Sequence, residues 1–176
     1  MGATLWLNGE TYPGSKILEE VLDVEHHLHN RERWCGISAD QGGEDWALEA
    51  GLTVFRATSG LGVFGAGATD AAKIISTDDT PFIAGMTRFD VHRVKVHAAS
   101  NANPYVLRFV WDATDMATGE AAGRYSDVMI SDARKGGPVD IIMPRLTLTD
   151  KVWCRAKNGT DDATIDFFIG LHEYVV

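Results

Sequence analysis

Apolar residues near the N-terminus recur at the spacing of a helix. Ser15 is a residue type that caps helix N-termini, and Gly36 is one that ends helices. The apolar positions between them are Ile17, Leu18, Val21, Leu22, Val24 and Leu28. Intervals of three or four residues place most of them on one face. The pattern predicts one amphipathic α-helix over residues 17–34, within a helical segment at 15–36.

From residue 37 onward the pattern changes to short β-branched and aromatic runs, separated by Gly, Asn, Asp and Pro. The runs occupy residues 52–57, 72–76, 89–98, 105–111, 125–130, 139–143, 151–156 and 164–174. They predict a mainly β domain over residues 37–176, an antiparallel β-sandwich with a jelly-roll-like strand order. Strand count alone leaves other sandwiches and a barrel open. A short helical piece is expected at 114–122. The run at 164–174 is apolar on both faces in its centre, so we expect a central strand or one covered by a partner subunit.

Residues 1–14 show no regular period and contain the turn dipeptides Asn8-Gly9 and Pro13-Gly14. This predicts an extended N-terminal arm. The arm is too apolar for a free tail, and the apolar stripe of the helix also needs a cover. The sequence therefore predicts a homo-oligomer with interfaces on the arm, on the helix and on the apolar strand surface near the C-terminus. The expected interface residues are Leu5, Trp6, Leu7, Tyr12, Leu18, Val21, Leu22 and Leu28.

Composition is that of an ordinary globular protein. The chain of 176 residues suits one domain, and its 45% hydrophobic and 23% charged residues lie far from the signature of disorder. A formal net charge of −9 disfavours nucleic acid as a partner. Neither a membrane span nor a signal peptide is recognisable, so we expect a soluble protein without a membrane partner that folds in a cytoplasm. Cys35, at the end of the predicted helix, and Cys154, in a predicted strand, are then expected to be reduced and semi-buried.

Two motifs resemble ligand sites. The sequence Gly-Leu-Gly-Val-Phe-Gly at 60–65 matches the dinucleotide-binding fingerprint, but Ala-Gly-Ala-Thr after it is a poor start for the helix that the fingerprint requires. A mobile, glycine-rich surface loop is the better interpretation. His26, His27 and His29 lie among glutamates, yet a fourth metal ligand is not evident and the spacing is not that of a metalloprotease helix. Solvent or subunit contact is expected there.

Other residues suggest catalysis or sugar binding less well. Asp90, His92 and His97 need a serine to form a hydrolytic triad, and no serine lies in a nucleophile elbow. The acidic turns at 78–79 and 161–162, together with Asp112 and Asp115, could supply oxygen ligands to calcium, but they do not follow the calcium-binding loop pattern and are expected to form turns. Strand aromatics that might stack on a sugar are expected in the core: Tyr105, Trp111, Tyr125 and Trp153. The residues thus predict a protein that is not an enzyme, with no catalytic, cofactor or metal site.

Four segments together carry a family resemblance: residues 23–34, 80–93, 151–158 and 165–174. They resemble a group of uncharacterised, virion-associated proteins encoded by tailed bacteriophages. The resemblance implies a virion component made in the host cytoplasm, either a capsid decoration or cement protein or a minor capsid protein. Its partners would be the major capsid protein or other virion proteins, and analogy with virion jelly rolls favours a homotrimer. The alternative is a receptor- or carbohydrate-binding β-sandwich module of a phage tail or fibre.

Overall fold

The computed structural model describes residues 4–7, 10–13, 33–38, 52–65, 73–76, 82, 84–131 and 137–175. The chain divides into two compact units, Met1–Arg31 and Glu32–Val176. Most of the predicted helix, including the interface candidates Leu18, Val21, Leu22 and Leu28, lies outside the described residues.

The first unit contains a β-hairpin where an extended arm is predicted. Strand β1 (Thr4–Leu7) pairs antiparallel with β2 (Glu10–Pro13), and Leu7 stands opposite Glu10. The sequence between them is Asn8-Gly9, a dipeptide strongly favoured in two-residue hairpin loops. This local turn chemistry explains why the segment pairs with itself. The candidates Leu5, Trp6, Leu7 and Tyr12 are thus strand residues, and the structure does not describe their side chains.

The predicted helix is wrong at its C-terminal end. Residues Arg33–Cys35 form strand β3, which pairs antiparallel with β14 (Thr164–Val175). Nη1 of Arg33 lies 2.6 Å from Oε2 of Glu173 on β14, and Cys35 is 3% exposed within the core. Cys35 is therefore a buried strand residue and not a helix end. Tertiary pairing here overrides the helical spacing of the sequence.

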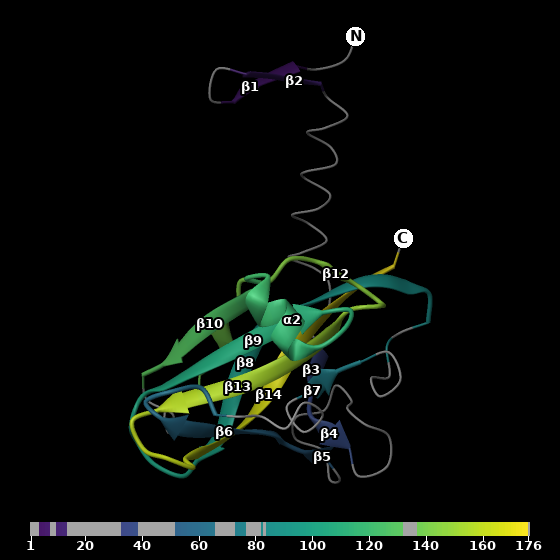
Figure 1. The fold of residues 1–176 in the computed structure, drawn as a ribbon. Helices are drawn as coiled ribbons and strands as arrows, with labels where there is room; N and C mark the ends of the chain where they lie inside the picture. The colour runs from purple at the N-terminus through teal and green to yellow at the C-terminus, as the bar shows by residue number, and fades with distance from the viewer. Residues whose placement is uncertain are drawn as a thin grey trace. The chain divides into compact units, whose positions relative to one another are not determined.

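The second unit is built on one curled, mixed sheet whose main path runs β10-β9-β13-β6-β14-β8-β11 (Figure 1). These strands are β6 (Phe55–Leu61), β8 (Met86–Ala99), β9 (Tyr105–Asp112), β10 (Tyr125–Ile130), β11 (Val139–Asp140), β13 (Lys151–Asn158) and β14. Off the path, β12 (Leu146–Thr147) pairs with β8 and β7 (Lys73–Ile75) with β13, while β4 (Ile37–Ser38) and β5 (Leu52–Thr53) form a separate pair. Every strand segment predicted from the sequence contains or overlaps one of these strands. The fold is therefore mainly β, as predicted.

The sheet is mixed and not entirely antiparallel, which corrects the prediction of an antiparallel β-sandwich on this point. Strands β6 and β13 run parallel, with Ala156 opposite Ser59 and Asn158 opposite Leu61. The two strands lie far apart in sequence, and the chain between them makes β8, β9 and β10 before it returns. Such a long crossover permits parallel pairing, which a hairpin connection does not.

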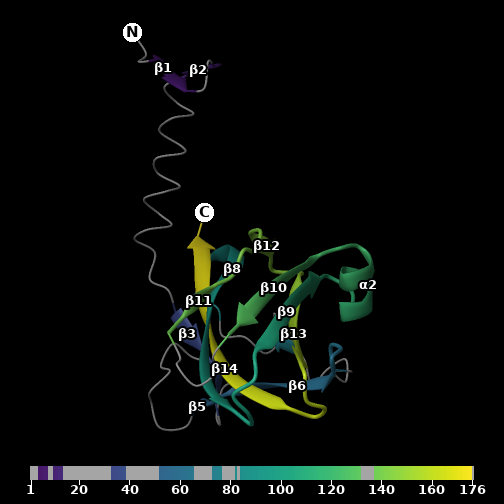
Figure 2. The ribbon, with the colours of Figure 1, turned by 90° about the vertical axis from the view of Figure 1, so that its left-hand side faces the viewer.

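The sheet bends so that β8, β11 and β14 face β9, β10 and β13 across the core (Figure 2). Phe109 of β9 meets Phe167 of β14 edge-on, with ring centroids 6.1 Å apart. The end strands β10 and β11 approach each other within 8 Å between Cα atoms. Strand β14 lies centrally between β6 and β8, as its two apolar faces predict. Its apolar side chains between Ile165 and Leu171 are buried within this chain, so this part of the strand needs no partner subunit to cover it.

The short helix predicted at 114–122 is confirmed as α2 (Met116–Ala121). Asp115 caps it, because its carboxylate accepts a hydrogen bond of 2.8 Å from the backbone N–H of Thr118. Met116 packs on Val110 and Trp153 and forms a second, small cluster on the outer side of β9 and β13. The helix thereby covers one end of that outer face and leaves the other end open.

Candidate functional site

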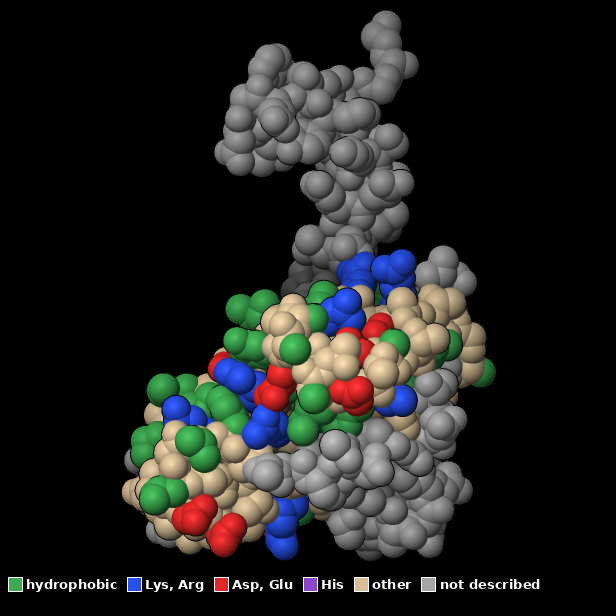
Figure 3. Space-filling view, viewed as in Figure 1, with side chains coloured by type: hydrophobic (Ala, Val, Ile, Leu, Met, Phe, Trp, Pro, Cys, Tyr) green, Lys and Arg blue, Asp and Glu red, His purple; other side chains and the backbone are tan. Residues whose placement is uncertain are grey.

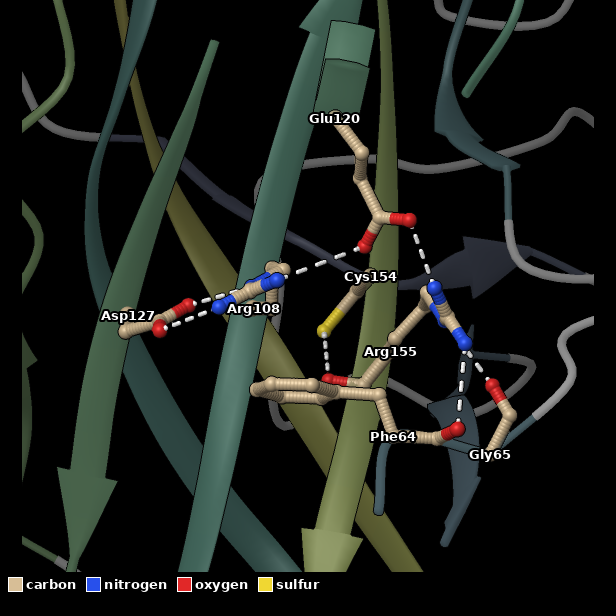
Figure 4. A network of polar contacts seen from close by, with 7 residues as sticks. All are labelled: Phe64, Gly65, Arg108, Glu120, Asp127, Cys154 and Arg155. Atoms are coloured by element: carbon tan, nitrogen blue, oxygen red, sulfur yellow. Dashed lines mark hydrogen bonds and ion pairs between the residues drawn. The ribbon is translucent and has the colours of Figure 1, made fainter. Parts of the chain in front are cut away.

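Next to α2, the outer face of β9, β10 and β13 carries a network of ion pairs centred on Arg108 (Figure 4). Nε and Nη2 of Arg108 donate to the two carboxylate oxygens of Asp127, each at 2.7 Å. The guanidinium lies between the rings of Phe64 and Tyr125, at 4.1 and 3.9 Å from their centroids. The hydrogen bonds to Asp127 raise the pKa of Arg108. Bidentate pairing and stacking hold this arginine in one orientation.

Arg155 extends the network from β13 to the loop that follows β6. Its Nη1 donates to Oε2 of Glu120 on α2 at 2.6 Å, and Oε1 of the same carboxylate lies 3.7 Å from Nη1 of Arg108. The other nitrogens of Arg155 donate to backbone carbonyls, Nε to Gly65 O at 2.8 Å and Nη2 to Phe64 O at 3.0 Å. Hydrogen bonds from Arg155 therefore join the loop and the helix to β13. The ion pair between Glu120 and Arg108 connects this set to β9 and, through Asp127, to β10.

The glycine-rich sequence at 60–65 is the end of β6 and a turn bonded to β13. The N–H of Gly62 donates to Asn158 O at 2.8 Å, and the N–H of Gly65 donates to Ala156 O at 2.9 Å. In a dinucleotide site such amides lie at a helix N-terminus and face the pyrophosphate. Here they are used within the sheet. The motif is thus explained by close backbone packing, and residues 61–63 are exposed, as expected for a glycine-rich segment at the surface.

Beyond the ion pairs, apolar side chains gather over the ends of β6, β10 and β13 (Figure 3). Leu61, Val63 and Met129 are 66%, 61% and 68% exposed. Met129 stands opposite the half-buried Val106, which also faces Lys157, and the last residue of β13 pairs with Leu61. We call Leu61, Val63, Val106 and Met129 the apolar patch. Met129 and Val106 are neighbours on the outer face, whereas Leu61 and Val63 lie at the end of β6 and in the turn that follows it. Exposed apolar side chains of this kind are typical of a contact site.

A second cluster lies where β8 pairs with β14, with Asp90 directly opposite His172. Oδ1 of Asp90 is 3.5 Å from Nδ1 of His172, and the imidazole rings of His92 and His172 stack at 4.4 Å. One potential ligand atom from each of Asp90, His92 and His172 lies within 4.8 Å of the others. Asp90 and His172 are buried, and His92 is half-buried. The structure thus brings two imidazoles and a carboxylate together.

Tyr174 fixes the carboxylate of this cluster. Its hydroxyl donates to Oδ2 of Asp90 at 2.7 Å. Burial, followed by this hydrogen bond, raises the pKa of Tyr174 to about 12, so the phenol stays protonated at neutral pH. The guanidinium of Arg145 lies 4.2 Å above the ring of Tyr174. Asp90 is therefore held with one oxygen toward Tyr174 and the other toward His172.

The hydrolytic triad considered from the sequence is not assembled. Asp90 and His92 are together, but His97 instead meets Phe168 edge-on at 5.6 Å. Ser59 donates to Thr160 O at 2.9 Å, and Ser100 accepts from the N–H of Thr164 at 3.0 Å, so both serines serve in turns. Sequence reasoning missed the partnership of His172 and Tyr174 with Asp90. The run of polar residues His172, Glu173 and Tyr174 near the end of an otherwise apolar strand was the available signal.

The remaining sequence candidates have structural roles in the described part of the chain. Tyr105 and Trp153 are buried, as expected for core aromatics, whereas Tyr125 is 38% exposed with one ring face against Arg108. Asp112 accepts from the N–H of Thr114 and pairs with an arginine. The histidines at 26, 27 and 29 lie outside the described residues.

No protein family, curated protein or solved structure matches the chain. The helices among the described residues include none that is long and apolar enough to cross a membrane.

Proposed function

We propose that this chain is a structural component of a bacteriophage virion, either a capsid decoration or cement protein or a minor capsid protein. In this role it binds neighbouring subunits and catalyses no reaction. The resemblance of its sequence to tailed-phage proteins supports the virion context. The curled sheet, whose two halves face each other across one core, supports a sandwich-like, jelly-roll-related framework for this role. The observation that carries the binding function is the apolar patch.

The apolar patch favours a protein partner on energetic grounds. Fully burying a side chain such as Leu, Val or Met contributes roughly 1.5–3 kcal/mol. Since Leu61, Val63 and Met129 are about two-thirds exposed, covering all three contributes on the order of 3–6 kcal/mol. Repeated over many copies on a lattice, a contact of this size supports stable attachment.

The ion pairs beside the patch make it a fixed surface. Arg155 binds the loop that carries Val63 to the sheet, and Arg108 with Asp127 joins β9 to β10 two residues before Met129. A preorganised surface loses little conformational entropy on binding. The partner we propose is the major capsid protein or another virion protein, with this chain as a homo-oligomer and most simply a trimer.

A glycan-binding function receives less support from the same face. A sugar-stacking platform needs several aromatic rings exposed together. Tyr105 and Trp153 are in the core, Trp111 is half-buried, and Tyr125 is already stacked against Arg108. The apolar patch is aliphatic, which suits contact with a protein better than contact with a sugar ring.

The proposal is tested with the full chain and with capsids of the phage that encodes it. Sedimentation at micromolar concentration gives the oligomeric state, and co-sedimentation with capsids gives attachment. Val63→Asp and Met129→Glu each place a charge in the apolar patch, and we expect both to remain folded and to lose attachment. Ala117→Asp, which adds the same charge on the exposed side of α2, is the matched control and should attach like the wild type. Unchanged attachment of both patch variants, or no attachment of the wild type, would contradict the proposal.

A further inference from the structure

We propose that Asp90, His92 and His172 bind one divalent transition-metal ion such as Zn²⁺ or Co²⁺. Their potential ligand atoms already lie within 4.8 Å of one another. Two imidazole nitrogens and one carboxylate oxygen form a donor set that suits zinc and other first-row metals, and three protein ligands leave a coordination position for water or another ligand. The inference is independent of the apolar patch.

The strands fix where these donors stand. Asp90 and His172 face each other in the register between β8 and β14, the pair of long strands at the centre of the domain. Gly170 pairs with Arg93, but the next residue of β14, Leu171, pairs with Val91. His92 is therefore an additional residue on β8, and it forms a β-bulge. The N–H of Ile141 donates to the carbonyl of His92 at 2.7 Å and fixes the backbone of this bulge. Donors placed on paired strands are held more firmly than donors on loops.

The surroundings resemble the support that metal ligands receive in proteins. Ligating carboxylates are commonly hydrogen-bonded by a neighbouring side chain that orients them. Tyr174 does this for Asp90 through Oδ2, which leaves Oδ1 toward His172. His92 is the half-buried member, so an ion reaches the cluster from its side.

Binding requires one small rearrangement. Tetrahedral zinc with bonds of about 2.0–2.1 Å brings its ligand atoms to roughly 3.3–3.5 Å from each other. The atoms here lie within 4.8 Å, and the two rings stack with an interplanar angle of 23°. A rotation of the half-buried His92 ring out of the stack brings its nitrogen toward the other two donors. The buried residues Asp90 and His172 need little movement.

The test uses Co²⁺ titrated into the full, metal-free chain, followed by visible absorption and by equilibrium dialysis for stoichiometry. Because His26, His27 and His29 also bind metals in principle, every protein in the series carries His→Gln at these three positions. We expect this background protein to bind one Co²⁺ per chain. His92→Gln and Asp90→Asn should abolish the absorption band, and His97→Gln, a histidine on the same strand outside the cluster, should retain it.

Tyr174→Phe tests whether Tyr174 supports the metal site by orienting Asp90 through a hydrogen bond and is not itself a ligand. Loss of such a supporting contact typically weakens metal binding by about 10–100-fold, so we expect the Co²⁺ band to remain with an affinity lowered by that factor. The hydroxyl removed donates to Oδ2 of Asp90, and the substitution leaves all three proposed ligands in place. An affinity equal to that of the background protein would remove Tyr174 from the proposed role.

A measurement on the background protein itself covers the case in which a ligand variant fails to fold. Zn²⁺ should shift the ring nitrogen resonances of His92 and His172 in a ¹H–¹⁵N spectrum and leave those of His97 in place. The proposal is overturned if the background protein binds no ion, if folded His92→Gln and Asp90→Asn bind as the background does, or if Zn²⁺ leaves the resonances of His92 and His172 unchanged.

Discussion

Replacing Gly65 with alanine tests whether the glycine-rich motif is a packing device. An added Cβ at this position would lie 2.0 Å from the carbonyl oxygen of Thr58 and 3.1 Å from the carbonyl carbon of Ser59. Real Cβ atoms essentially never come closer than 3.0 Å to another heavy atom, so the two backbones must separate by about 1 Å. No side-chain rotation relieves this clash, because the opposing atoms belong to the backbone of β6.

The structure sets the size of the effect. A shift of 1 Å stretches the hydrogen bond from the Gly65 N–H to Ala156 O and the one from Arg155 Nε to Gly65 O, now 2.9 and 2.8 Å. A neutral hydrogen bond contributes about 0.5–1.5 kcal/mol and a charged one about 1.5–3 kcal/mol. We therefore expect Gly65→Ala to lower the free energy of unfolding by about 3 kcal/mol, at the upper end of the range for overpacking.

Denaturant unfolding of the full chain measures this effect against two other glycines. Gly62 has φ +64° and open space around a Cβ, so Gly62→Ala should cost only about 1–2 kcal/mol for the left-handed conformation. Gly137 has neither restriction, and Gly137→Ala should stay within about 0.5 kcal/mol of the wild type. A Gly65→Ala variant as stable as Gly137→Ala would refute the packing explanation of the motif.

Two further predictions concern buried polar groups. The backbone N–H of Thr114, and then the charge of Arg124, lower the pKa of Asp112, so its charged form stabilises the folded state. This contribution is present above the unfolded pKa near 3.8 and is lost as the pH falls through the lower folded value. The stability difference between the wild type and Asp112→Asn in urea should therefore be constant above about pH 5 and shrink toward pH 2.5, and an equal difference at both ends would contradict it. Burial raises the pKa of the Cys154 thiol, and Cys35 is a second buried thiol that forms no disulfide. Both should react with an aromatic disulfide reagent only at the rate of unfolding, and rapid labelling of the native protein would show that a thiol is accessible.

Local sequence signals predicted most of the sheet. Strand segments are found where β-branched and aromatic runs end at Gly, Asn, Asp or Pro, as at the turn that begins with Ser100 and leads to Tyr105 of β9. The capping residue Asp115 likewise marks α2. These signals act within a few residues, so they can be read from the chain directly.

Structural features that depend on pairing with distant segments could not be predicted from local sequence. β3 is a strand because it lies beside β14, although its own sequence continues a helical pattern. The parallel pairing of β6 with β13 depends on how the intervening strands fold. The apolar patch is also a product of register, because Met129 and Val106 become neighbours only when β10 pairs with β9.

The position of the Asp90 cluster shows how far one residue of register can change a site. Strict alternation along β8 would place Asp90 and His92 on the same face as Val94, which is fully buried in the core. In the structure Val91 and Val94 are both core residues, because the extra residue in the bulge shifts the alternation between them. Asp90 and His92 are thereby turned toward His172 instead of into the apolar interior. The bulge depends on the pairing with β14 and gives no signal in the sequence of β8. The polar residues of the cluster can therefore be identified in the sequence, but the sequence does not show that they lie together.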